Sequence, residues 1–116
     1  MKNILIIGCG LIGSSVLRAA HAKKVSKNIY VYEQSKKNIS IIKKLKIGCK
    51  VINKLNNISI NFDLVIFCTP MSQYPNIVPR INKFISNKTI VTDVGSAKEL
   101  SFKLVKKKLK KNITWI

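Results

Sequence analysis

The chain has 116 residues, 47% of them hydrophobic, which fits a single domain with enough apolar side chains to form a core. Its 22 basic and 4 acidic residues give a net charge of +18 at pH 7, a value that raises the question of nucleic-acid binding. Because 20 of the basic residues are Lys and only 2 are Arg, and the aromatic residues mostly fall on apolar faces, we expect no nucleic-acid partner.

A strand and a helix are expected at the start of the chain, joined by a glycine turn. Residues 4–7 are apolar, and Gly8, Gly10 and Gly13 follow them at the spacing of a dinucleotide-binding turn. Gly8 permits the tight turn, Gly10 lets the backbone approach a pyrophosphate, and Gly13 lets the helix pack against the strand. The N–H groups at the start of the helix then face the phosphates. We therefore expect cofactor contacts from the turn and the first helical residues, namely Gly8, Cys9, Gly10, Leu11, Ile12 and Gly13.

The first twenty or so residues also have features of a secretion signal. Lys2 gives a basic start, residues 4–13 are mostly apolar, and Ala20-His21-Ala22 resembles a small-residue cleavage site. However, three glycines would weaken a hydrophobic helix of this length, and cleavage would remove the first strand. The chain also has no apolar run near the roughly 18 residues that a membrane span needs. We therefore expect a cytoplasmic protein with no membrane partner.

A second strand is expected over residues 28–32, and it ends at an acid. Glu33 stands 20 residues after Gly13, where a carboxylate accepts hydrogen bonds from both ribose hydroxyls and repels a 2′-phosphate. This position favours NAD over NADP. Lys36 and Lys37 could pair with a 2′-phosphate, so NADP stays open as a cofactor.

The rest of the chain alternates apolar strands and helices. The remaining strands are expected at residues 51–52, 62–68, 88–92 and 113–116. The remaining helices are expected at residues 35–46, 74–85 and 97–111. Pro79 removes a helical hydrogen bond, so the helix that contains it either starts late or kinks. Gly48 is expected to end the helix before it.

This alternation predicts an α/β fold with a doubly wound parallel sheet, the three-layer αβα Rossmann dinucleotide-binding fold, in the strand order 3-2-1-4-5-6. Ligands then bind at the carboxyl ends of the strands, where Glu33, Thr69, Pro70 and Asp93 come together. The side chains expected to face the sheet are Leu11, Ile12, Val16, Ala19 and Ala20 on the first helix and Ile39, Ile42 and Leu45 on the second.

The cysteines and the single histidine carry no sign of a metal site. Cys9, Cys49 and Cys68 are odd in number, form no CxxC pair and have no histidine beside them, so we expect reduced thiols in or near the core. Only Cys9 lies where it could touch a cofactor, and then through its backbone. His21 falls late in the first helix, away from the strand ends, and we expect no chemical role for it.

Three segments of the chain carry a wider pattern, IGCGLIGSS at residues 7–15, DLVIFCTP at residues 63–70 and TDVGSAK at residues 92–98. The first two occur in many reductases. The third is specific, because an Asp-x-x-Ser-x-Lys turn after the fifth strand marks one family. Over essentially its whole length the chain resembles the nucleotide-binding domain of the prephenate and arogenate dehydrogenases, oxidoreductases of tyrosine and hence aromatic amino acid biosynthesis.

The resemblance implies an NAD-dependent oxidative decarboxylation of prephenate or arogenate. Hydride leaves the ring carbon that bears the hydroxyl, a base takes the hydroxyl proton, and the ring carboxylate departs as carbon dioxide. In that family the serine of the third motif hydrogen-bonds near the nicotinamide and the substrate hydroxyl, so the resemblance assigns catalytic roles to Ser96 and Lys98. Ser96 could also cap the following helix, and Lys98 could be a solvated lysine.

The resemblance also implies that residues 1–116 are a Rossmann domain that is incomplete at its C-terminus. The chain stops at residues 114–116, where the family's His-Pro motif would begin, so the catalytic base would lie beyond Ile116. It also lacks the helical domain that supplies the substrate arginine and the dimer interface. We therefore expect the chain alone to be inactive and the parent enzyme to be a homodimer.

Two other classes of protein remain open. Hydroxyacid dehydrogenases and pyrroline-carboxylate reductases share this half-fold but lack the Asp-x-x-Ser-x-Lys turn. A nucleotide-sensing module without catalysis, such as the nucleotide-gated domains of potassium transport systems, would be complete near this length, whereas this chain ends inside an expected strand.

Overall fold

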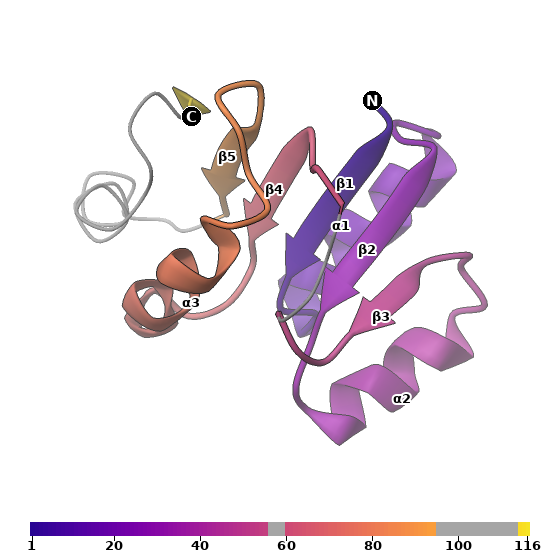
Figure 1. Cartoon of the computed structure of the whole chain (residues 1–116). Helices are drawn as coiled ribbons and strands as arrows, with labels where there is room; N and C mark the ends of the chain where they lie inside the picture. Colours follow the sequence, from indigo (N-terminus) through magenta and orange to yellow (C-terminus); the bar gives the residue numbers. More distant parts are fainter. Residues whose placement is uncertain (56–59, 95–113) are drawn as a thin grey trace.

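The computed structural model describes residues 1–55, 60–94 and 114–116, and these form one parallel six-stranded sheet in the order β3-β2-β1-β4-β5-β6 (Figure 1). The strands are β1 (Asn3–Ile7), β2 (Asn28–Tyr32), β3 (Lys50–Ile52), β4 (Leu64–Phe67), β5 (Ile90–Asp93) and β6 (Thr114–Trp115). Every neighbouring pair runs parallel. The predicted doubly wound sheet and its strand order are confirmed. The order reverses between β1 and β4, which is where such sheets bind ligands.

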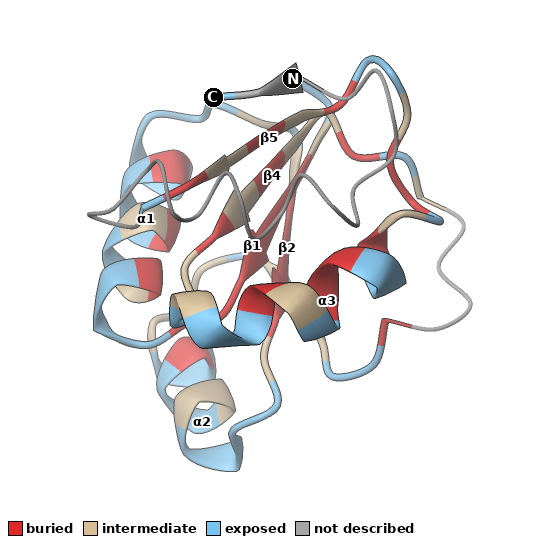
Figure 2. Cartoon of the chain, turned by 90° about the vertical axis from the view of Figure 1, so that its left-hand side faces the viewer, coloured by how far each residue is buried: buried red, intermediate tan, exposed pale blue. Residues whose placement is uncertain are grey.

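The helices of the described residues lie on both faces of this sheet. They are α1 (Leu11–Ala22), α2 (Lys36–Lys44), the short 3₁₀ helix η1 (Met71–Gln73) and α3 (Tyr74–Ile81). The helices α1 and α2 cover one face and α3 covers the other, with buried sides toward the strands and exposed sides outward (Figure 2). No helix among the described residues combines the length and the apolar character that crossing a membrane requires.

The core is divided into two apolar clusters by the sheet, because successive side chains of a strand point to opposite faces. On β1, Ile4 and Ile6 pack with Leu17 of α1, whereas Leu5 and Ile7 belong to the cluster beneath α3. All four of these strand residues are at most 1% exposed. A central strand that is buried on both faces needs a continuous apolar run, which is why this segment could be identified as a strand from the sequence.

The side of α1 that faces the sheet differs from the prediction. Leu11 and Ile12 are 88% and 55% exposed, and Ala19 is also exposed. The buried residues are Gly13, Leu17 and Ala20. The reason is a close contact at Gly13, where a Cβ atom would overlap the Gly8 carbonyl oxygen. This contact turns the Gly13 side of the helix inward, and Val16 is only partly buried at its margin.

The ends of several elements also differ from the prediction. Ser35 caps α2 by accepting a hydrogen bond from the Asn38 N–H at 3.3 Å, and Ile42 is its buried residue. The chain leaves this helix through Lys46, with φ of +53°, so Gly48 does not end it. The third predicted helix does begin at Tyr74, so a late start is wrong, but it ends at Ile81 with Pro79 inside.

Three strands are shifted or shorter than predicted. The run expected at residues 62–68 is a strand only at Leu64–Phe67, the strand expected at 88–92 lies at Ile90–Asp93, and the last covers Thr114–Trp115. The helix expected at residues 97–111 lies outside the described residues. Strand ends depend on which neighbour is available for pairing, and the apolar run alone does not contain that information.

Asp63 joins three strands at the amino edge of the sheet. Its carboxylate oxygen Oδ2 accepts hydrogen bonds from the backbone N–H groups of Lys2 at 2.8 Å and Asn3 at 2.9 Å. Its backbone carbonyl accepts from the Ile90 N–H at 2.9 Å. The two N–H groups hold the pKa of the Asp63 carboxyl below its usual value, with the Asn3 bond the larger cause. The ionised carboxylate therefore favours the folded state.

We expect Asp63→Asn to lower the thermal unfolding temperature at neutral pH, because its neutral amide accepts weaker hydrogen bonds than a carboxylate. The pKa of Asp63 is depressed in the folded state, so its contribution is present above the unfolded value of about 4 and is lost as the pH falls through the folded value. The difference between wild type and variant should therefore be constant above about pH 5 and shrink as the pH falls below about 4. A difference that does not change as the pH falls from about 5 to about 2 would show that the charge is not what stabilises the fold.

Candidate functional site

The glycine turn after β1 is shaped by two close backbone approaches. Gly8 has φ of +86°, and a Cβ there would lie 2.5 Å from the Thr69 methyl carbon Cγ2. Gly13 approaches the Gly8 carbonyl equally tightly, as described above. As predicted, Gly8 permits the tight turn and Gly13 permits the close packing of the helix. These contacts bring the start of α1 and the end of β4 close to the end of β1.

Gly10 differs from the other two glycines because no atom of the described residues lies within 4 Å of the position that its Cβ would take. It precedes α1 as the N-cap residue, and no side chain caps the helix there. Its carbonyl accepts bonds from the Ser14 N–H at 2.9 Å and the Ser14 hydroxyl at 2.7 Å. No side chain of the described residues caps the first-turn N–H groups of α1, so they are available to an anion at the helix start.

The Glu33 carboxylate accepts four hydrogen bonds. Its Oε1 accepts from the Cys9 N–H at 2.8 Å and from the Asn38 side-chain amide at 3.1 Å. Its Oε2 accepts from the N–H groups of Gln34 at 2.9 Å and Ser35 at 3.1 Å. A carboxylate has about four lone-pair sites, so these donors fill them. Glu33 therefore ties the glycine turn to the segment that leads into α2.

This hydrogen-bond network limits how Cys9 and Glu33 could make their predicted contacts with a cofactor. The Cys9 N–H is already bonded to Glu33, so a backbone contact from Cys9 would have to use another atom. Ribose hydroxyls can reach Glu33 only by replacing one of its four donors. The Asn38 amide is the replaceable one, because it belongs to a side chain, whereas the other three are backbone groups held by the turn.

The predicted contacts from Thr69 and Pro70 lie just after β4, beside Gly8. Thr69 packs its methyl group near Gly8, and its hydroxyl oxygen is buried with no hydrogen-bond partner among the described residues. A buried hydroxyl that stays unpaired costs about 1–3 kcal/mol, so an orphan of this kind indicates a place for a polar ligand. Pro70 is exposed and begins η1.

Asp93 is the fourth strand-end residue predicted to contact the cofactor, and its side chain is buried against the start of α3. It is 5% exposed, and its Oδ2 accepts a hydrogen bond from the Tyr74 hydroxyl at 2.9 Å. Burial, and then this bond to Asp93, raise the pKa of Tyr74 well above its usual value. The Tyr74 ring also packs on Phe67, with centroids 4.8 Å apart. Sequence reasoning missed Tyr74, because a buried tyrosine on an apolar helix face gives no signal of its polar partner.

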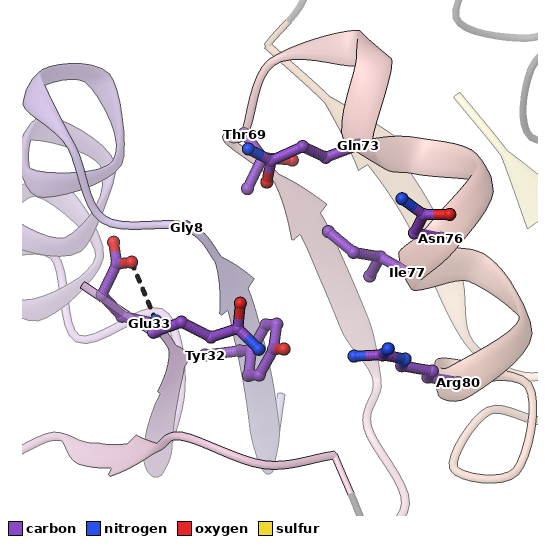
Figure 3. A pocket seen from close by; sticks show the side chains of 9 residues that line it. Gly8, Tyr32, Glu33, Thr69, Gln73, Asn76, Ile77 and Arg80 are labelled. Atoms are coloured by element: carbon purple, nitrogen blue, oxygen red, sulfur yellow. Dashed lines mark hydrogen bonds between the residues drawn. The ribbon is translucent and has the colours of Figure 1, made fainter.

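A pocket of about 280 Å³ opens at the carboxyl edge, between the end of β2 and α3 (Figure 3). Gly8 and Thr69 line it from the turns after β1 and β4. From the side of β2 it is lined by Tyr32, Glu33 and Gln34. From the side of η1 and α3 it is lined by Gln73, Asn76, Ile77 and Arg80. The pocket therefore joins the glycine turn to a group of polar side chains that no sequence motif had identified.

The three cysteines are free thiols, as predicted. Burial raises the pKa of Cys9 and of Cys49, and raises that of Cys68 to about 12, so all three resist ionisation at neutral pH. Across residues 1–55, 60–94 and 114–116 no three metal-binding side chains gather into a possible metal site. His21 lies in the last turn of α1 and is exposed. Ser96 and Lys98, the predicted catalytic residues, fall outside the described residues.

Comparison with known proteins decides the family. Residues 16–116 match the sequence model of the prephenate dehydrogenase nucleotide-binding domain. The chain belongs to this family. The match begins after the glycine turn, so the turn supports the assignment of a nucleotide-binding fold independently. The family and the fold inferred from the sequence motifs are both confirmed.

The chain is also similar to individual proteins, and the solved structures among them share its fold. Cyclohexadienyl dehydrogenase of Zymomonas mobilis is 29% identical over 112 residues, which are 97% of this chain and 38% of that protein. The structure of prephenate dehydrogenase from A. aeolicus with hydroxyphenyl propionate and NAD⁺ has a TM-score of 0.75 at 22% identity, over 94% of this chain and 40% of that one. Synechocystis arogenate dehydrogenase has a TM-score of 0.66 at 19% identity, over 89% and 37%. The prephenate dehydrogenase-type domain described here thus spans about two fifths of the length of these relatives.

Proposed function

We propose that this domain binds NAD as the cofactor-binding part of a prephenate or arogenate dehydrogenase. The observation that carries the proposal is the space over Gly10 that no described residue fills, at the start of α1, where no described side chain caps the helix, and next to the turn at Gly8 that lines the pocket together with Glu33 and Thr69. The pyrophosphate would lie over Gly10 and accept hydrogen bonds from the first-turn N–H groups. The unpaired Thr69 hydroxyl lies on the same edge and would gain a partner.

NAD is preferred over NADP in this proposal because of the charge and position of Glu33. A carboxylate at the end of β2 repels a 2′-phosphate and accepts hydrogen bonds from ribose hydroxyls. The Asn38 amide now occupies one acceptor position on Glu33, at 3.1 Å. We infer that this amide gives way to a ribose hydroxyl while the three backbone donors stay. Lys36 and Lys37 are exposed at the start of α2 and would favour NADP only if they reached the same position.

For the chemistry, we propose that the Ser96 hydroxyl hydrogen-bonds to the substrate hydroxyl that loses its proton. NAD supplies the hydride acceptor. Lys98 would place a positive charge close to the anionic substrate. The buried Tyr74–Asp93 bond supports this assignment, because it anchors the end of β5 immediately before residues 95–98. The net charge of +18 would also draw an anionic cofactor and a carboxylate substrate toward the domain.

Replacing Gly10 tests where the phosphates lie. We expect Gly10→Val to leave the domain folded, because its side chain would enter open space, but to weaken NAD binding by more than about 100-fold, or ~2.7 kcal/mol, because that space is the one the pyrophosphate needs. Circular dichroism measures folding and titration calorimetry measures binding. Gly13→Val is the matched control, and it should unfold the domain because its side chain would overlap the Gly8 carbonyl. NAD affinity that survives in Gly10→Val would place the phosphates elsewhere.

Replacing Glu33 tests the choice between NAD and NADP. Glu33→Ala should weaken both dinucleotides, because the Cys9 N–H loses its acceptor and the turn loosens. NAD should lose more affinity than NADP, so the ratio of the two dissociation constants should move toward one. Ser35→Ala is the control, since it removes the cap of α2 and should leave the ratio unchanged. If the unmodified domain binds NADP as tightly as NAD, the preference for NAD is wrong.

Replacing Ser96 tests its role in an enzyme that carries this domain together with a substrate domain. We expect Ser96→Ala to lower kcat more than it raises KM, with a loss of about 1–3 kcal/mol of transition-state stabilisation. NADH absorbance with prephenate or arogenate as substrate measures the turnover. An unchanged kcat together with a lower melting temperature would identify Ser96 as a helix cap alone.

A further inference from the structure

One end of the pocket beside Glu33 lies away from the glycine turn and is lined by Tyr32, Gln34 and residues of η1 and α3. Tyr32 and Ile77 form its apolar part and are only 5% and 6% exposed. The remaining side chains there are exposed and polar, and they come from the segment after β2 and from α3. In Figure 3 the Arg80 guanidinium extends from α3 toward Tyr32, across the opening. Apolar walls from Tyr32 and Ile77, together with the cationic Arg80 side chain, make this part of the pocket suitable for a flat aromatic ring.

Carboxamides give this end of the pocket a second chemical character. Gln34, Gln73 and Asn76 all line it, and no hydrogen bond of their side chains is found within the described residues. A carboxamide carries a donor and an acceptor side by side, which matches the donor and acceptor edge of adenine. Three such groups around one pocket favour a purine base over a phosphate, because a phosphate offers acceptors only.

Arg80 is chemically distinct from the rest of this basic chain. Of 22 basic residues only Arg18 and Arg80 are Arg, and Arg18 is exposed on α1, which covers the opposite face of the sheet. Arg80 has no hydrogen-bond or ion-pair partner in the part of the chain that the structure describes. Its planar guanidinium can stack on a base, which the compact ammonium group of Lys cannot do. A lysine would serve equally well if only a positive charge were needed.

Resting on the proposed binding of NAD, we propose that Arg80 is the residue that determines binding of the adenine ring. The ring lies between Tyr32, on the side of β2, and Ile77 with the Arg80 guanidinium, on the side of α3, with its edge toward the carboxamides. The ribose would then lie at Glu33 and the pyrophosphate over Gly10, next to the turn that Gly8 contributes to the pocket. Arg80 thereby contributes the stacking of its planar guanidinium group as well as its positive charge.

The test compares Arg80→Lys and Arg80→Met with the control Arg18→Lys, using calorimetry with NAD and with ADP-ribose, which keeps the adenosine and lacks the nicotinamide. Arg80 is exposed, so all three variants should fold, as circular dichroism would confirm. We expect Arg80→Lys to weaken both ligands by about 5- to 30-fold, Arg80→Met to weaken them at least as much, and Arg18→Lys to change neither.

Each other outcome overturns the assignment of Arg80 in a recognisable way. Wild-type affinity in Arg80→Lys with loss only in Arg80→Met would mean that Arg80 acts as a point charge on a phosphate. Wild-type affinity in both variants, in a domain whose NAD binding is still abolished by Gly10→Val, would place the adenine elsewhere and leave the proposed function intact. Failure of the unmodified domain to bind either ligand would overturn the proposed function itself.

Discussion

The close approach of α1 to the end of β1 is the constraint on which the rest of the site depends. Gly13 packs so tightly on the Gly8 carbonyl that no Cβ fits between them. This contact fixes where α1 begins and which side of it meets the sheet, because Leu17 and Ala20 lie one and two turns further along the same side. Leu11 and Ile12 consequently face outward, and the first-turn N–H groups point to the carboxyl edge.

Carboxylates hold the two edges of this sheet in place. Glu33 joins the glycine turn to the start of α2 through backbone N–H groups, Asp63 joins β1 to β4, and Asp93 joins β5 to α3 through Tyr74. Charged acceptors form stronger hydrogen bonds than neutral ones, so a few acids can organise much backbone. In a chain with only 4 acidic residues, three of them therefore serve the architecture.

Glu33 shows how architecture and binding share one group. Its four donors among the described residues stabilise the turn, and in the proposed complex with NAD three of them stay when the ribose hydroxyls bind. Binding then exchanges one side-chain hydrogen bond for another, and the turn keeps its shape. A preorganised turn loses little conformational entropy on binding, which favours affinity without any new backbone contact.

The amino-acid sequence by itself determined the strand order, the glycine turn, the acid after β2 and the family. These features depend on apolar runs that alternate between strands and helices, on the spacing of the glycines and Glu33 in the first βαβ unit, and on three short motifs, and each of these is a local property of the chain. Tertiary structure alone decided that Gly13 turns one side of α1 inward, that Tyr74 bonds to Asp93, that the Asn38 amide bonds to Glu33, and that Arg80 lines the same pocket as the end of β2. Each of these contacts joins residues whose relative placement depends on packing and side-chain direction, and neither periodicity nor spacing along the chain contains that information.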